Sequence, residues 1–155
     1  MDLPKLRKKL KKQQEIGWCE CIDLPGLGLR RIKAKIDSGA ATSSIHATRI
    51  RPLDIDGVPH VEFWFRAHKG ERAARYRAPV VEQRSVTSSN GERQLRYVIE
   101  TTMRLGKLHW RGHLTLANRG RMTFPILIGR RALRRGFLVN CRHRYMLGKP
   151  EESDR

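Results

Sequence analysis

Residues 35–43 read KIDSGAATS, a run that joins a strand-like pattern to an acidic turn. Over residues 31–36, apolar and basic side chains alternate with the period of two that is typical of a half-buried strand. Asp37 therefore follows the end of a strand, where Ser38 can hydrogen-bond to nearby backbone and Gly39 permits a close approach that a Cβ would block. Taken alone, the tripeptide is also typical of a plain Asx turn, so its surroundings must decide whether it is catalytic.

The composition indicates a basic, single-domain protein. The 155 residues include 33 Lys and Arg against 15 Asp and Glu, which gives a formal net charge of +18. Such a charge favours a polyanionic partner, either a nucleic acid or an acidic peptide. No apolar run approaches the roughly 20 residues of a membrane span. Three cysteines, few and odd in number, suit a reducing compartment, so we expect a cytoplasmic protein without membrane contact.

Short apolar stretches separated by turn residues predict an all-β body. Asp56-Gly57 and Asn90-Gly91 are typical of tight hairpin turns. Many short strands at hairpin spacing favour a small closed or nearly closed β-barrel. The strands are expected at residues 16–22, 29–36, 45–50, 61–66, 80–86, 97–105 and 108–116.

The C-terminal part follows a different pattern. Residues 124–129 form an apolar run that predicts a strand buried on both faces. Residues 130–135 are then expected to form a short helix that Gly136 ends. Two further stretches, 137–139 and 145–147, are expected to supply closing strand material.

Three segments are expected along the chain. Residues 1–14 are a basic N-terminal arm, either a short helix or disordered, because six Lys or Arg accompany leucines at helical spacing. Residues 15–148 form the barrel. Residues 149–155 are a charged, flexible tail.

Three features, in their order along the chain, resemble the retropepsins, the retroviral-type aspartic proteases. In that family an Asp-(Thr or Ser)-Gly loop follows a strand, a glycine-bearing flap hairpin comes in mid-chain, and two apolar residues and a glycine precede a short helix. The matching positions here are Asp37-Ser38-Gly39-Ala40, a flap over residues 86–96, and Ile126-Leu127-Ile128-Gly129-Arg130. The resemblance covers residues 32–139 and implies a small closed acid-protease barrel with one short helix near its C-terminal end.

A closer resemblance is to the RimB-type bacterial proteins, retropepsin-like members long labelled ATP-dependent zinc proteases. Residues 35–40, 86–91 and 127–133 are similar to the signature blocks of that family. The resemblance implies an aspartic-type peptidase that hydrolyses the poly-α-glutamate tail added to a small-subunit ribosomal protein by the ligase RimK.

Aspartic proteolysis requires two carboxylates that share about one proton, and this chain has one Asp-Ser-Gly. Asp54 and Asp56 lie in a hairpin turn without the following Ser/Thr-Gly. We therefore expect a homodimer in which Asp37 pairs with its symmetry mate across a two-fold axis.

In the expected homodimeric aspartic peptidase, each motif has a role. Asp37, Ser38 and Gly39 form the catalytic loop, supported from below by Ile128, Gly129 and Arg130. The flap tip and neighbouring positions are expected to contact substrate: Ala40, Ser89, Asn90, Gly91 and Leu127. Arginines near the flap and in the loop at residues 118–123 would pair with substrate carboxylates. They are Arg84, Arg93, Arg96, Arg119 and Arg121, each of which could instead lie on a solvated barrel rim.

No cofactor and no metal are expected. A four-ligand set would require the fold to bring together Cys19, Cys21, Cys141 and His143, and small buried cysteines with a surface histidine are the simpler interpretation. The alternative to an enzyme is a basic β-barrel that binds RNA or the ribosome, with Trp64 or Trp110 as stacking platforms. A third alternative joins the two functions in a peptidase that also contacts ribosomal RNA.

Overall fold

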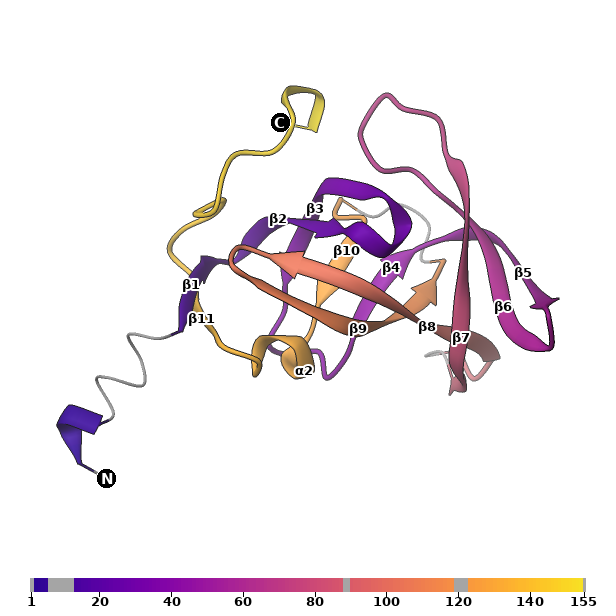
Figure 1. Ribbon diagram of the computed structural model, residues 1–155, viewed down its shortest axis with the longest axis horizontal. Coiled ribbons are helices and arrows are strands. Elements are labelled where there is room, and N and C mark those ends of the chain that lie inside the picture. Colours follow the sequence, from indigo (N-terminus) through magenta and orange to yellow (C-terminus); the bar gives the residue numbers. More distant parts are fainter. Residues whose placement is uncertain (1, 6–12, 88–89, 119–122, 155) are drawn as a thin grey trace.

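Six strands close into a mixed barrel that carries the Asp-Ser-Gly loop (Figure 1). The computed structural model describes residues 2–5, 13–87, 90–118 and 123–154. The barrel order is β2-β3-β10-β4-β9-β8, and the pairing of Asp23 with Arg104 returns β8 to β2. The expected closed all-β barrel is thus confirmed. Its strands are β2 (Cys19–Leu24), β3 (Leu29–Ile36), β4 (Ser43–His46), β8 (Arg93–Leu105), β9 (Leu108–Ala117) and β10 (Ile126–Ile128).

Three further strands extend the sheet beyond β8, and they project to the right of the barrel in Figure 1. They are β7 (Ala74–Thr87), β6 (Val58–Phe65) and β5 (Thr48–Ile55). A separate two-stranded parallel sheet joins β1 (Gln14–Gly17) to β11 (Phe137–Asn140).

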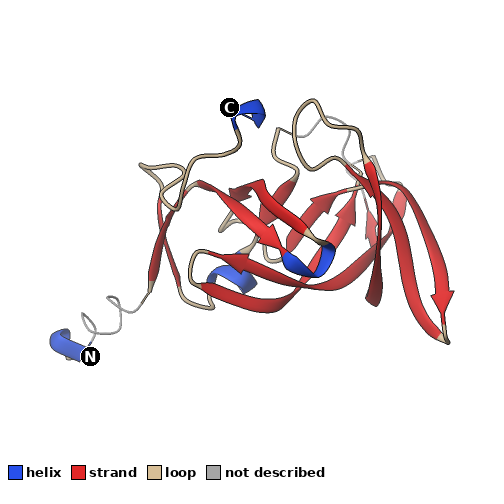
Figure 2. Ribbon diagram, turned by 45° about the horizontal axis from the view of Figure 1, so that its top comes forward, coloured by secondary structure: helices blue, strands red, loops and turns tan. Residues whose placement is uncertain are grey.

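Helices are few and short (Figure 2). The expected helix near the C-terminal end is present as α2 (Arg130–Leu133), and 3₁₀ turns occur as η1 (Pro25–Leu27) and η2 (Glu152–Asp154). Over the described residues, no helix has the length and apolarity needed to span a membrane.

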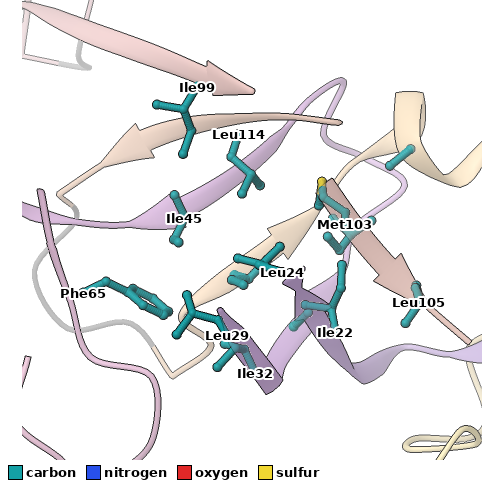
Figure 3. Packing of buried hydrophobic residues seen from close by; sticks show 14 of the residues in the cluster. Ile22, Leu24, Leu29, Ile32, Ile45, Phe65, Ile99, Met103, Leu105 and Leu114 are labelled. Atoms are coloured by element: carbon teal, nitrogen blue, oxygen red, sulfur yellow. The ribbon is translucent and has the colours of Figure 1, made fainter. Parts of the chain in front are cut away.

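The barrel interior is filled by the apolar side chains of alternating strand positions. On β3 the positions of Leu29, Ile32, Ala34 and Ile36 are buried, while Lys35 is exposed. Side chains from β2, β4, β8 and β9 meet them in one cluster (Figure 3). Each fully buried aliphatic side chain contributes about 1.5–3 kcal/mol to stability, so this cluster is the main source of the barrel's cohesion.

Two expected strands are interrupted in the structure, and the prediction was wrong at these points. Residues 16–22 divide into β1 and β2 around Trp18, whose N–H donates to the carbonyl of His143 at 2.9 Å. Residues 45–50 divide at Ala47, where the chain leaves β9 and begins to pair with β6. In both cases the chain changes its pairing partner, which an apolar pattern does not reveal.

Residues 145–147 form a turn rather than the expected strand. The reason is the buried carboxylate of Glu20, which accepts backbone N–H bonds from Met146 at 2.9 Å and Leu147 at 3.1 Å, as well as from Gly17 at 2.7 Å. These amides are satisfied by one side chain and do not need a neighbouring strand.

The C-terminal tail has specific contacts with the barrel. Asp154 is buried and accepts a 2.6 Å hydrogen bond from the backbone N–H of Lys69, and its other oxygen lies 2.6 Å from Nδ1 of His68. The ammonium of Lys33 donates to the Asp154 carbonyl at 2.9 Å. The expectation of a flexible tail did not anticipate these contacts. Most of the basic arm, residues 6–12, lies outside the described residues.

Candidate active site

The candidate catalytic carboxylate lies in the tight loop that follows β3. The Asp37 backbone N–H donates to the carbonyl of Ile128 at 2.9 Å, and its carbonyl accepts from Ala40 at 3.2 Å. The Asp37 Oδ1 atom accepts the N–H of Gly39 at 2.9 Å. The side chain is half-buried. One carboxylate oxygen is therefore oriented by backbone, as expected for an acid whose position matters.

Strand β10 fixes this loop from below because it lies between β3 and β4. Ile128 pairs in parallel with Ile36 of β3, and Leu127 pairs in antiparallel register with Ser44 of β4. Residues about 90 positions apart in sequence thus hold the two ends of the loop. The Ile128 carbonyl lies directly against the Asp37 backbone, and its role in supporting a catalytic loop stays a prediction.

Gly129 packs under the loop more closely than any other residue type could. A Cβ at this position would lie 2.5 Å from the carbonyl oxygen of Thr42 and 2.9 Å from that of Ala40. The Gly129 N–H also donates to the buried hydroxyl of Ser43 at 3.0 Å. Sequence reasoning found Gly129 but missed Ser43, whose only signal is its place a few residues after the acid.

Arg130 joins α2 to the same loop. Its backbone N–H donates to the Ala40 carbonyl at 2.8 Å, and its guanidinium donates to the Ser38 carbonyl at 2.9 Å. Arg130 thus has two hydrogen bonds to the loop, and Gly129 lies against the same Ala40 carbonyl. The direct bond to Ser38 was not expected from the sequence, and the supporting role of Arg130 stays a prediction.

The expected flap is the long hairpin of β7 and β8, whose described ladder ends at the pair Thr87 and Arg93. Near the tip, Gly91 has a φ of +84°, which glycine adopts without strain. Asn90 accepts the N–H of Glu92 through its side-chain oxygen at 3.3 Å. Three candidate substrate contacts lie outside the described residues: Ser89, Arg119 and Arg121.

Two of the three flap arginines, Arg84 and Arg96, lie on one face of this hairpin. Arg84 and Arg96 lie directly opposite each other, so their side chains point to the same side. Arg84 binds Glu82 through two contacts, at 2.8 and 3.0 Å. These hydrogen bonds lower the pKa of the Glu82 carboxyl and raise the pKa of the Arg84 guanidinium. Arg93 is exposed at the start of β8, the strand that also carries Arg96.

The candidate metal ligands do not form a site. Burial raises the pKa of the Cys19 thiol and raises that of Cys21 to about 11. Cys141 and His143 are exposed. Within the described ranges, no three His, Cys, Asp or Glu side chains lie close enough together to hold an ion.

The hydrogen bonds that the structure describes for Asp37 are all to backbone groups. No hydrogen bond connects Asp37 to a second carboxylate within the described part of the chain. Asp54, the other aspartate that caps a glycine turn, lies at the tip of the β5–β6 hairpin.

The family model of RimB-like proteins, described as retropepsin-like aspartic endopeptidases of the RimB type, matches residues 15–150. The chain belongs to this family. The matched region includes the Asp37 loop, the flap hairpin, β10 and α2. Membership confirms the sequence-based identification of an aspartic-type peptidase.

Curated relatives of this family member include longer proteins. A probable alpha-L-glutamate ligase from Shewanella pealeana is 42% identical over 134 residues, which is 85% of this chain and 29% of the relative. Another from Desulfotalea psychrophila is 36% identical over 93% of this chain and 30% of its own length. The chain thus spans less than a third of these relatives.

A solved structure shares the fold. The crystal structure of a Legionella pneumophila protein of unknown function (DUF785) superposes with a TM-score of 0.70 at 24% identity, covering 85% of this chain and 96% of that one. The likeness supports the barrel architecture.

Proposed function

We propose that this RimB-like protein is a homodimeric aspartic peptidase that hydrolyses acidic peptides, with poly-α-glutamate tails as its substrate class. The observation that carries the proposal is the Asp37 carboxylate, oriented by Gly39 and anchored through its backbone to Ile128. Such a carboxylate acts as a general base on water when a second carboxylate shares its proton.

The second carboxylate would come from another copy of the chain, because the sequence contains one Asp-Ser-Gly. A two-fold axis between the two Asp37 side chains would bring the two carboxylates together. In this arrangement Ser38 supports the neighbouring loop. Asn90 and Gly91 of each flap close over the substrate and exclude water.

Two features favour an acidic substrate. The chain carries a formal charge of +18, and the flap presents Arg84 and Arg96 on one face. The relatives named alpha-L-glutamate ligases add a third line of support. A hydrolase region that shares a polypeptide with such a ligase would act on the same kind of polymer. The tail of a small-subunit ribosomal protein, modified by RimK, is the target that the family resemblance suggests.

Cleavage of defined peptides tests this proposal. The wild-type protein should hydrolyse an α-linked deca-glutamate, and should cleave deca-glutamine and γ-linked glutamate much more slowly. Asp37→Asn should be inactive on all three. EDTA should leave the rate unchanged, because the described residues offer no ligand set. Equal cleavage of the glutamine peptide would contradict acidic specificity, and inactivity of the wild type on every peptide would contradict the peptidase itself.

Dilution tests the shared site. Activity per mole of chain should fall as the concentration drops through the dimer dissociation range measured by sedimentation. Adding excess Asp37→Asn chains should also inhibit the wild type, because mixed dimers carry only one competent carboxylate. Constant activity per mole where sedimentation shows monomer would rule out a site shared between copies.

RNA contact is a second candidate function, favoured by the outer face of the β5–β6–β7 extension. The guanidinium of Arg49 lies 5.3 Å from the ring centre of Trp64, and three arginines surround the carboxylate of Glu62. They are Arg51, Arg75 and Arg77. Arginines beside an aromatic ring suit stacked bases and phosphates. Loss of salt-dependent RNA binding in an Arg51→Gln/Arg77→Gln variant would support this role, and unchanged binding would exclude it.

A further inference from the structure

A basic pocket of about 130 Å³ opens on the flank of the barrel, between the flap strands and α2. Its floor includes Trp110 of β9, and Thr42 and Ser43 form one side. Five basic side chains line it: Arg84, Arg111, His113, Arg131 and Arg135. Only Arg84 among these was expected from the sequence to contact substrate.

The pocket is built on the same backbone as the candidate catalytic loop. Thr42 and Ser43 follow that loop directly, and the Arg131 N–H donates to the Ala41 carbonyl at 3.2 Å. Arg84 contributes from β7, a strand of the flap hairpin. A peptide that lies between the loop and the flap therefore has this pocket beside its path.

Carboxylates of the protein pair with only some of the arginines that line the pocket. Arg84 binds Glu82, and Arg111 binds the carboxylate of Glu100 at 2.8 Å. Arg131 and Arg135 have no ion pair with a carboxylate among the described residues. The pocket thus retains two arginines whose donors are directed to no protein acid.

Arg135 is held in place by an aromatic ring. Its guanidinium carbon lies 5.8 Å from the ring centre of Trp110, a cation–π contact that restricts the side chain and leaves its N–H groups available. Arg131 and Arg135 are four residues apart along α2 and the turn that follows it. Side chains at this spacing on a helical turn begin about 5–6 Å apart.

We propose that this pocket binds side-chain carboxylates of an acidic peptide beyond the bond to be cleaved. The proposal rests on the peptidase function above and adds a subsite to it. Alternate side chains of an extended peptide point the same way and lie about 6.5–7 Å apart, a separation that two long arginine side chains starting about 5–6 Å apart can reach. The open pocket has room for a carboxylate and accompanying waters.

Under this proposal, the protein distinguishes long acidic peptides from short ones. A peptide of three glutamates fills the cleft at the catalytic carboxylates, whereas ten glutamates also reach the pocket. Charge-assisted hydrogen bonds contribute about 1.5–3 kcal/mol each, so loss of a pocket arginine corresponds to roughly a 10- to 100-fold weaker binding. This loss should affect long peptides and spare short ones.

The test uses the full-length chain with Asp37→Asn, which binds without hydrolysis. Affinities for fluorescent tri-glutamate and deca-glutamate are measured with and without Arg131→Gln and Arg135→Gln. The matched control is Arg134→Gln, which removes an exposed arginine from the same segment that does not line the pocket. We expect deca-glutamate to bind about 10- to 100-fold more weakly to the pocket variants and within about 2-fold of normal to the control.

A spectroscopic measurement covers the case in which a variant is unstable. In the Asp37→Asn protein, deca-glutamate should shift the indole N–H resonance of Trp110, which lines the pocket, and leave that of Trp64 in place. In the active enzyme, the pocket variants should raise KM for deca-glutamate and preserve kcat. Partial rescue by Arg131→Lys is expected, because a positive charge returns without the guanidinium fork.

The outcomes separate this inference from the proposed function. Equal weakening by Arg131→Gln and Arg134→Gln, or a loss that is the same for both peptide lengths, overturns the pocket while leaving the peptidase intact. Pocket-dependent binding of deca-glutamate without cleavage by the wild type overturns the peptidase and keeps the pocket. Stronger competition by inorganic phosphate than by tri-glutamate overturns the choice of a carboxylate ligand.

Discussion

Two aspartates in this chain make nearly the same local turn, yet their surroundings differ sharply. Asp37 accepts the N–H of Gly39 at 2.9 Å, and Asp54 accepts that of Gly57 at 2.7 Å. Each carboxylate thus orients a glycine turn at the end of a strand. The Asp37 turn is bonded to Ile128 and closed from below by Gly129. The Asp54 turn caps an exposed hairpin, and a Cβ at Gly57 would meet nothing within 4 Å.

The comparison teaches that the acid–glycine turn is a common local structure and that the candidate catalytic role depends on distant support. Strand β10 reaches the Asp37 loop from residues 126–128, and in the part of the chain that the structure describes no distant strand reaches Asp54. Substitutions at matched positions of the two turns should therefore have very different effects.

The largest difference is expected for the two carboxylates themselves. Asp37→Asn should reduce peptide hydrolysis by at least about 10³-fold, because the amide cannot act as a general base. Asp54→Asn should retain activity within about 2-fold, since its turn lies away from the loop. Initial rates on deca-glutamate measure both. Comparable losses would show that the distinction between the two turns is mistaken.

The supporting glycine should give the next largest effect. In Gly129→Ala the new Cβ meets backbone oxygens, which cannot rotate away, so we expect a loss of about 1–3 kcal/mol in the free energy of unfolding and about 100-fold in activity. Gly57→Ala places alanine at a φ of +81°, which costs about 1–2 kcal/mol of backbone strain without touching the site. Urea titration and initial rates separate the two. Full activity in Gly129→Ala would contradict the support role.

Two adjacent serines of β4 allow a finer test. Ser43→Ala removes the acceptor for the buried Gly129 N–H and should cost about 1–3 kcal/mol of stability. The Ser44 hydroxyl is buried without a hydrogen-bond partner among the described residues, so Ser44→Ala should be neutral or slightly stabilising. Thermal unfolding measures this pair. Equal destabilisation would mean that the Ser43 contact adds nothing.

The smallest effect is expected three residues further along β4, at His46. Burial lowers the pKa of this imidazole, Arg66 lowers it further, and the Ala117 carbonyl raises it. As the pH falls below about 6.5, the unfolded chain takes up a proton that native His46 resists, so its contribution makes the fold less stable toward acid. Replacing His46 with Gln should reduce the dependence of the urea unfolding midpoint on pH, over the range from pH 7.5 down to the lowered native pKa. An unchanged slope would contradict this assignment.

Much of the barrel could be predicted from the sequence because alternation reports burial directly. The buried positions of Ile32, Ala34 and Ile36 on β3 follow the period of two, and Asp56-Gly57 forms the expected turn, with φ values of +51° and +81°. The family motifs added the order of the acid, flap and helix. These signals are local, and each concerns residues that are neighbours in sequence.

The remainder depends on contacts between distant segments. An apolar run at residues 126–128 predicts burial, but nothing in it states that the strand inserts between β3 and β4. Glu20 looks like a surface residue in an alternating pattern, yet its carboxylate replaces a strand as the partner of Met146 and Leu147. The pocket arginines, such as Arg131 and Arg135, belong to a charge run, and nothing in that run indicates that they line a pocket with Trp110.

The insertion of β10 between β3 and β4 determines when the site can form during synthesis of the chain. The Asp37 loop is anchored by residues near position 128, so a ribosome must release most of the chain before the loop acquires its support. Domains generally fold as units during synthesis, and contacts this distant in sequence form late. A nascent chain with Asp37 already outside the exit tunnel would thus lack an organised carboxylate. Hydrolytic capacity would then arise only after the segment around residue 128 has left the tunnel and has paired with β3 and β4.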